Sequence, residues 1–160
     1  MKRSRLILLA LLIGLIFYLT LPEKPSEDFY LARVKRIIDG DSILVAYQGE
    51  EISLRLSGID APEYGDDYAA EAADKLRAML GDEGVIYFIR AYPETDIYQR
   101  WLVYGYPKPP GDIHDSLNAA LVRQGLAVVP DYPDRSLYYD ELKAIEEDAR
   151  RQGLGLHRLE

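Results

Sequence analysis

Alternation of apolar and polar residues in the N-terminal half of the chain predicts three consecutive β-strands. The runs YLARVKRII (30–38), SILVAY (42–47) and ISLRLSGI (52–59) are rich in β-branched and aliphatic residues, as strands are. DGD and QGEE separate these runs, and a glycine beside acidic or polar residues is typical of a tight turn. In the third run the aliphatic residues alternate with polar ones, so Arg55 falls on the polar face. Short turns between neighbouring strands indicate an antiparallel meander.

A different periodicity follows the third strand and predicts an α-helix. Its apolar positions recur at spacings of three and four, and they are Ala69, Ala72, Ala73, Leu76, Met79 and Leu80. Asp66 or Asp67 can cap the start of this helix, and Gly81 can end it.

The second half of the chain returns to strands and then to helices. VIYFIR (85–90) and WLVYGY (101–106) predict two further strands, and PKPPGD predicts a loop. Helices are expected in DSLNAALVRQG, with a cap near Asp115, and in SLYYDELKAIEEDARRQG. Three strands, a helix, two strands and further helices is the order of an OB-type barrel. We therefore predict a mainly β (α+β) fold, a five-stranded Greek-key barrel with about three α-helices.

The N-terminus differs from the rest of the chain and predicts export. The basic stretch MKRSR precedes sixteen residues without a charge, LILLALLIGLIFYLTL. This length lies between the core of an export signal, about 7–15 residues, and a spanning helix, about 17–25. The absence of an A-x-A-like cleavage site favours a signal anchor over a cleaved signal peptide. We expect a hydrophobic helix at 1–21, a tether at 22–29 and one domain at 30–158, held outside the cytoplasm at the membrane or, alternatively, secreted after cleavage.

Composition and charge narrow the chemistry of any site. The chain has no cysteine, which excludes disulfides and thiolate metal sites. A bound metal is therefore expected to be a hard cation with oxygen ligands. The net charge is −8, and residues 1–21 hold three basic residues and no acid, so the remaining 16 basic and 27 acidic residues give −11. Such a balance argues against broad electrostatic attraction to nucleic acid.

Five charged residues form the candidate site. Asp41 lies at the rim of the first turn, Arg55 on the third strand, Asp60 and Glu63 around the proline of GIDAPE, and Arg100 at the start of the fifth strand. Taken singly, each has a structural explanation as a turn residue, a helix cap or half of a surface ion pair. Taken together, they suit hydrolysis of a phosphodiester. A metal and arginines neutralise the charge of the transition state, and a carboxylate activates water.

Six segments resemble, in order, the thermonuclease (staphylococcal nuclease-like) family over residues 30–158. They are IIDGDSILV, LRLSGIDAPE, YAAEAADKLRAML, DIYQRWLVYGY, LNAALVRQGLAVV and AIEEDARRQGLGLH. The resemblance implies an OB-fold, a Ca²⁺ cofactor and endonucleolytic cleavage of DNA and RNA to products with 3′-phosphates. By position it also implies that Asp41, Asp60 and the Ala61 carbonyl bind Ca²⁺, and that Glu63 activates or positions water.

The same resemblance implies roles toward the substrate. Arg55 and Arg100 are expected to bind the phosphate and to act with Glu63 in catalysis. Tyr98 is expected to contact a nucleotide. Tyr132 is a second candidate for stacking, with packing under the last helix as the alternative.

Three departures from the family pattern affect substrate binding. The loop after Glu63 is short and lacks a basic flap. Ile97 stands where some relatives have a lysine, and Gln99 stands where a glycine is common. These changes weaken the expected affinity for nucleotides more than the chemistry, because all five charged residues are present.

Two functions remain open at this point. One is a monomeric, Ca²⁺-dependent endonuclease that prefers single strands. The other is a non-catalytic OB-fold module that binds a protein or nucleic acid at the cell surface. The acidic exterior and the short loop favour the binding module, whereas the presence of all five charged residues in register favours the nuclease.

Overall fold

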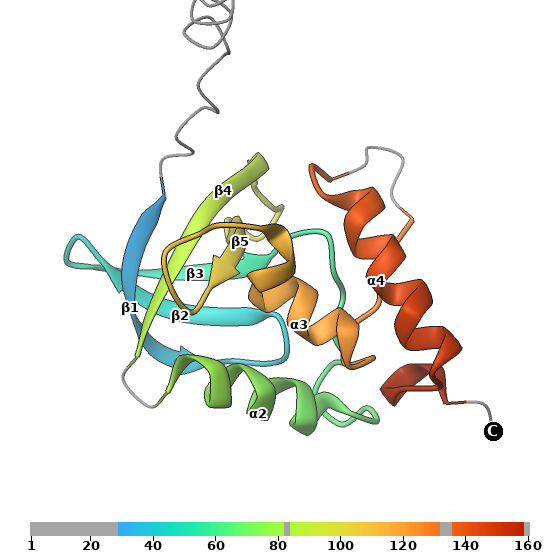
Figure 1. Ribbon diagram of the computed structural model, residues 1–160. Coiled ribbons are helices and arrows are strands. Elements are labelled where there is room, and N and C mark those ends of the chain that lie inside the picture. Colours follow the sequence, from blue (N-terminus) through green and yellow to red (C-terminus); the bar gives the residue numbers. More distant parts are fainter. Residues whose placement is uncertain (1–28, 82–83, 132–135, 159–160) are drawn as a thin grey trace, which may run out of the picture.

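Five strands form a closed barrel in the computed structural model, which describes residues 29–81, 84–131 and 136–158 (Figure 1). The strands are β1 (Tyr30–Ile37), β2 (Ser42–Tyr47), β3 (Glu50–Leu56), β4 (Val85–Thr95) and β5 (Trp101–Tyr106). Their order around the barrel is β1-β2-β3-β5-β4, and β1 also pairs with β4. All pairs are antiparallel except β3 with β5, which run parallel. The predicted five-stranded OB-type barrel is confirmed.

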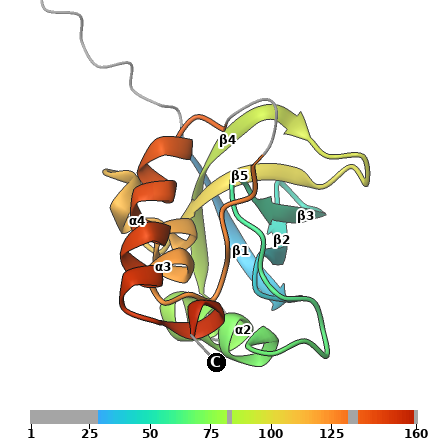
Figure 2. The same cartoon turned by 90° about the vertical axis from the view of Figure 1, so that its right-hand side faces the viewer.

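Three α-helices cover the barrel on two sides. They are α2 (Ala69–Leu80), α3 (Leu117–Arg123) and α4 (Tyr139–Arg151), with short 3₁₀ turns η1 (Ile113–Asp115) and η2 (Gly155–His157). Helix α2 lies across one end of the barrel, while α3 and α4 lie side by side on a flank (Figure 2). The barrel interior is closed by large side chains that are fully buried, among them Ile43, Leu54, Leu56, Ile86 and Phe88.

Asn118 ties α3 to the barrel. Its side chain is fully buried, and its amide donates to the carbonyl of Ser57 (2.8 Å) and accepts the N–H of Gly105 (3.1 Å). One side chain thus joins the residue after β3 to the last part of β5. Because Ser57 shortly precedes Asp60 in the chain, the contact with Asn118 helps to fix the start of the loop that carries Asp60.

Three local predictions differ from the structure. Strand β3 begins inside the predicted QGEE turn, at Glu50, and ends at Leu56, before Ile59. Neither Asp66 nor Asp67 caps α2, because Tyr68 occupies the N-cap in the left-handed region (φ 67°) and no side chain accepts a hydrogen bond there. Strand β4 continues past Arg90 to Thr95, since Thr95 pairs with Trp101 across an irregular register. Pro93 weakens the strand pattern in sequence, so this extension depends on the partner strand.

The predicted N-terminal helix and tether fall outside the described residues, and so does Tyr132. Within the part of the chain that the structure describes, no helix has the length and apolar character needed to cross a membrane.

Candidate active site

The DGD turn aims Asp41 into the molecule. A Cβ on Gly40 would lie 2.6 Å from the Cβ of Ala72 and 2.7 Å from the Cβ of Ala61, so only glycine lets the turn pack between α2 and the loop after β3. The backbone N–H of Asp41 donates to the carboxylate of Asp39 (3.0 Å), which stabilises the turn. The turn therefore reverses the chain and also presents a buried carboxylate.

The Asp41 carboxylate joins three segments of the chain. It accepts hydrogen bonds from the N–H of Ala61 (2.7 Å) and from the hydroxyl of Ser42 (3.2 Å), and it forms an ion pair with Arg55. Its side chain is 5% exposed, and a charge with so little exposure needs such partners. The loop that carries Asp60 and Ala61 is thereby held against the first turn.

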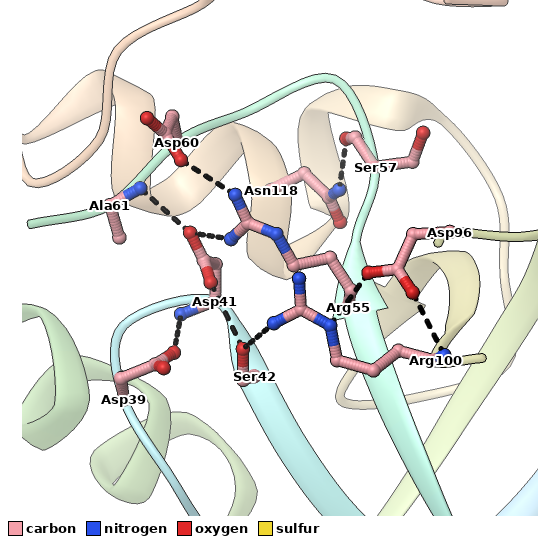
Figure 3. Close-up of polar contacts among 10 residues, drawn as sticks. All are labelled: Asp39, Asp41, Ser42, Arg55, Ser57, Asp60, Ala61, Asp96, Arg100 and Asn118. Carbon is pink, nitrogen blue, oxygen red and sulfur yellow. Dashed lines mark hydrogen bonds and ion pairs between the residues drawn. The ribbon is translucent and has the colours of Figure 1, made fainter. Parts of the chain in front are cut away.

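Arg55 lies between the two carboxylates that were predicted to bind metal. Its Nη1 pairs with Asp41 and its Nη2 with Asp60 Oδ1 (2.6 Å), as Figure 3 shows. The Arg55 side chain is 15% exposed, whereas Asp60 is 53% exposed. The cluster thus has a buried side at Asp41 and an open side at Asp60.

The backbone of Asp60 is fixed from the far side by a second cluster. Asp60 and Val128 exchange both backbone hydrogen bonds (2.8 and 2.9 Å). The next residue, Val129, donates its N–H to Glu146 Oε1 (2.9 Å) and accepts from Lys143 Nζ (2.6 Å). Helix α4 therefore fixes Val129 by hydrogen bonds, and the adjacent Val128 in turn fixes the backbone of Asp60. Glu146, which is 2% exposed, was missed in sequence because EE beside an apolar stripe resembles a solvated helix face.

Arg100 is positioned on the other side of Asp41. Its Nε pairs with Asp96 Oδ2 (2.7 Å), and its Nη1 donates to the hydroxyl of Ser42 (3.2 Å), which itself bonds Asp41. Figure 3 places Arg100 and Asp96 opposite Asp39, with Asp41 and Ser42 between them. Both arginines are thus linked to the same buried carboxylate.

Asp96 orients the turn before β5 and was also missed in sequence. Its carboxylate accepts the backbone N–H groups of Tyr98 (2.9 Å) and Arg100 (3.0 Å). Burial acts to raise the pKa of Asp96, but the hydrogen bonds from Arg100 and Tyr98 outweigh it and hold the pKa below its usual value. The pair is therefore fully formed above the ordinary pKa and is lost only as the pH falls through the lowered one.

The predicted substrate residues lie at the open edge of the cluster. Tyr98 is 73% exposed, and its ring centre is 5.5 Å from the Arg100 guanidinium carbon. Gln99 has φ 64°, a left-handed conformation that explains why glycine suits this position. Tyr132 cannot be placed because it lies outside the described residues.

Glu63 lies on the same loop as Asp60 but outside the ion-pair cluster. It is exposed, and its backbone carbonyl accepts the N–H of Asp66 (3.0 Å). Asp60, Ala61 and Glu63 together line an open cleft of about 390 Å³. The structure thus brings Asp41, Arg55 and Asp60 into direct contact, and it places Glu63 beside them on one cleft.

The donors at this centre suit a hard cation by their chemistry. They are the carboxylate oxygens of Asp41 and Asp60 and the backbone carbonyl of Ala61, with no nitrogen or sulfur donor among them. Over residues 29–81, 84–131 and 136–158, however, no three His, Cys, Asp or Glu side chains are gathered as a ligand group. Both carboxylates are paired with Arg55 instead. Water and substrate oxygens would have to complete the coordination.

Comparison with known proteins gives consistent matches. Residues 53–158 match the family described as staphylococcal nuclease homologue. A micrococcal nuclease of Shigella flexneri is 33% identical over 139 residues, which cover 82% of this chain and 76% of that protein. A thermonuclease of Staphylococcus intermedius is 29% identical over 129 residues, which cover 77% of this chain and 73% of that protein. A probable endonuclease lcl3 of Schizosaccharomyces japonicus is 36% identical over 126 residues, and the match spans about half (52%) of its length.

Proposed function

The chain belongs to the staphylococcal nuclease family and is a nuclease, and on that premise we propose that it is a Ca²⁺-dependent endonuclease with a preference for single strands. The supporting observation is the cluster in which Arg55 joins Asp41 to Asp60 while Arg100 reaches the same carboxylate through a hydroxyl. The non-catalytic binding module is set aside, because the family and these relatives are nucleases. Products with 3′-phosphates and action on both DNA and RNA belong to the proposal.

The residues of the centre divide the chemistry among them. Asp41, Asp60 and the Ala61 carbonyl would hold the Ca²⁺, which when bound supplies positive charge beside the phosphate. Arg55 and Arg100 would bind phosphate oxygens, since a planar guanidinium matches two oxygens at once.

Glu63 would take the proton from the attacking water. A general base must reach solvent and the phosphorus together. Glu63 meets the first condition because it is exposed, and its place on the cleft lined by Asp60 and Ala61 supports the second. Water attacks phosphorus, the bond to the 5′-oxygen breaks, and the arginines stabilise the charge that builds up on the phosphate oxygens.

The metal requirement can be tested directly. We expect the protein to cleave a single-stranded oligonucleotide in Ca²⁺ and to lose this activity in chelator. Asp41→Asn should raise the Kd for Ca²⁺ roughly tenfold or more, because it removes one of two ligand charges. Calcium titration and initial rates are the measurements, and Asp148→Asn, which removes an exposed carboxylate on α4, is the control. Undiminished cleavage in chelator would overturn the proposed cofactor.

The acidic surface predicts a shallow salt dependence. A domain near −11 repels a polyanion at long range, so binding must depend on the metal, on Arg55 and Arg100 and on stacking. The salt slope on single strands is about −0.7 per phosphate contact, and we expect roughly two or three contacts. The measurement is kcat/KM at saturating Ca²⁺ over a range of KCl. A slope equivalent to six or more contacts would reveal a basic groove and contradict this expectation.

We also propose that residues 1–21 hold the domain outside the cytoplasm at the membrane. The support is the uncharged run after a basic start in the sequence. Fractionation of cells should recover the full-length protein with membranes, and external protease should digest its domain. A processed form found mainly in the medium would show a cleaved signal peptide instead.

A further inference from the structure

We propose that a pocket beside the DGD turn binds the base of a substrate nucleotide next to the cleaved bond, with Tyr64 as the stacking residue. This inference rests on the proposed nuclease function and assigns a subsite to it. The pocket has a volume of about 540 Å³, within the range of roughly 300–1,000 Å³ that is usual for small-molecule sites. It lies between the first turn, the loop after Glu63 and one face of α2.

Two residues that line the pocket are close in sequence to residues of the candidate site. On one side Asp39 lines the pocket, and its carboxylate accepts the N–H of Asp41 (3.0 Å). On the other side Tyr64 lines it and directly follows Glu63 in the chain. Asp66 lines both this pocket and the cleft of Asp60, Ala61 and Glu63, so the two hollows are neighbours.

The aromatic wall has no packing role within the described fold. Tyr64 is 100% exposed and Ile38, across the pocket, is 46% exposed. Three alanines of α2 also line the pocket, and their small side chains leave room beside the helix. An exposed tyrosine beside an apolar surface suits a nucleobase, because base–aromatic stacking needs a flat face and little else.

The charges of the pocket favour a base over a phosphate. Asp39 and Asp66 line it, and both repel a phosphate but accept hydrogen bonds from exocyclic amino groups of cytosine or adenine. Arg77 also lines it but is paired with Asp74 (2.5 Å). Arg55 and Arg100, by contrast, lie at the centre itself. The phosphate therefore stays at the centre, and the attached base turns toward Tyr64.

The residue that links the pocket to the DGD turn and the residue that anchors Tyr98 lie on different sides of Asp41. In Figure 3 Asp39 is on one side of Asp41, whereas Asp96, which accepts the Tyr98 N–H, is on the other. Tyr64 and Tyr98 would then serve the nucleotides on the two sides of the cleaved bond. This arrangement offers a replacement for the basic flap that the short loop lacks.

The test asks whether the effect of removing Tyr64 disappears when one base beside the cleaved bond is removed. The full-length protein is assayed in Ca²⁺ on a single-stranded oligonucleotide with one cleavable linkage, and an abasic nucleotide is placed on either side of it in turn. On one side, the abasic change should lower kcat/KM about tenfold for the parent protein, the size of one lost stack. Tyr64→Ala should lower kcat/KM about tenfold on the intact substrate but less than twofold on that abasic substrate. Tyr64→Phe should retain the parent rate.

Control variants separate this subsite from a general effect. Tyr92→Ala removes a tyrosine that is 93% exposed and outside the pocket, and its effect should be the same on intact and abasic substrates. Equal losses for Tyr64→Ala on all substrates, or no loss, would overturn the subsite while leaving the nuclease in place. A parent protein that cleaves no substrate would overturn the proposed function and this inference with it.

The acidic lining gives a second readout. Cytosine should be cleaved faster than thymine at the coupled position by a few-fold, because only cytosine offers an amino group to the carboxylates. Asp66→Ala should reduce this preference. Equal rates for the two bases in the parent protein would overturn the role given to Asp39 and Asp66.

Discussion

Glu63→Gln is expected to lower kcat by about 10² or more while leaving Ca²⁺ binding unchanged. Glutamine has nearly the same shape as glutamate but cannot take a proton from water. Glu63 is exposed, and its side chain makes no hydrogen bond or ion pair with Asp41, Arg55 or Asp60 in the described structure. The cluster should therefore persist in the variant, so the loss should fall on the chemical step.

Single-turnover rates and a calcium titration measure the two halves of this expectation. Glu71→Gln is a suitable control, because it removes an exposed carboxylate in the first turn of α2 without touching the cleft. A Glu63→Gln protein that cleaves as fast as the parent would show that the base is another group. A large loss of Ca²⁺ affinity in the variant would instead make Glu63 a metal ligand.

Glu146→Ala is expected to destabilise the domain by about 2 kcal/mol, since it removes a buried carboxylate and leaves the buried N–H of Val129 without its acceptor. The N–H of Val129 would lose its acceptor, and Lys143 would lose a partner at 3.0 Å. Burial acts to lower the pKa of Lys143, but Glu146 and Asp131 together raise it above its usual value. Lys143 would keep Asp131 as a partner at 3.3 Å in the variant, so most of the loss should come from the Val129 N–H.

Urea unfolding of the variant and of Glu147→Ala provides the comparison. Glu147 is the adjacent acid but is exposed, so its loss should change the free energy of unfolding by less than about 0.5 kcal/mol. The midpoint should fall for Glu146→Ala with the m-value unchanged. Equal midpoints for the two variants would contradict the structural role. Because Val128 beside Val129 pairs with Asp60, Ca²⁺ affinity should also fall in Glu146→Ala.

Glu63 and Glu146 differ in burial and in the partners of their side chains. Glu63 is exposed, whereas the carboxylate of Glu146 is buried and bonded to Val129 and Lys143. Asp41 is buried like Glu146, but its ion-pair partner Arg55 also contacts the exposed Asp60.

Local periodicity determined most of the secondary structure and the identity of the candidate residues. Strands β2 and β5 begin and end where their apolar runs do, and α2 ends at Gly81 as predicted. Neighbouring side chains and turn glycines set these features, so they can be read from a single sequence. The resemblance to the nuclease family followed from the same segments, and the family match confirmed it.

Only the tertiary structure decided how the residues meet. Arg55 is 14 residues from Asp41, and Arg100 is 58 residues from Ser42, yet both contacts exist because the barrel brings β2, β3 and β5 together. Glu146 gained its role from Val129, 17 residues away. The path of β4 beyond Arg90 likewise depended on pairing with β5. Such contacts leave no signal in the local sequence, because the two partners are far apart along the chain and meet only in the folded protein.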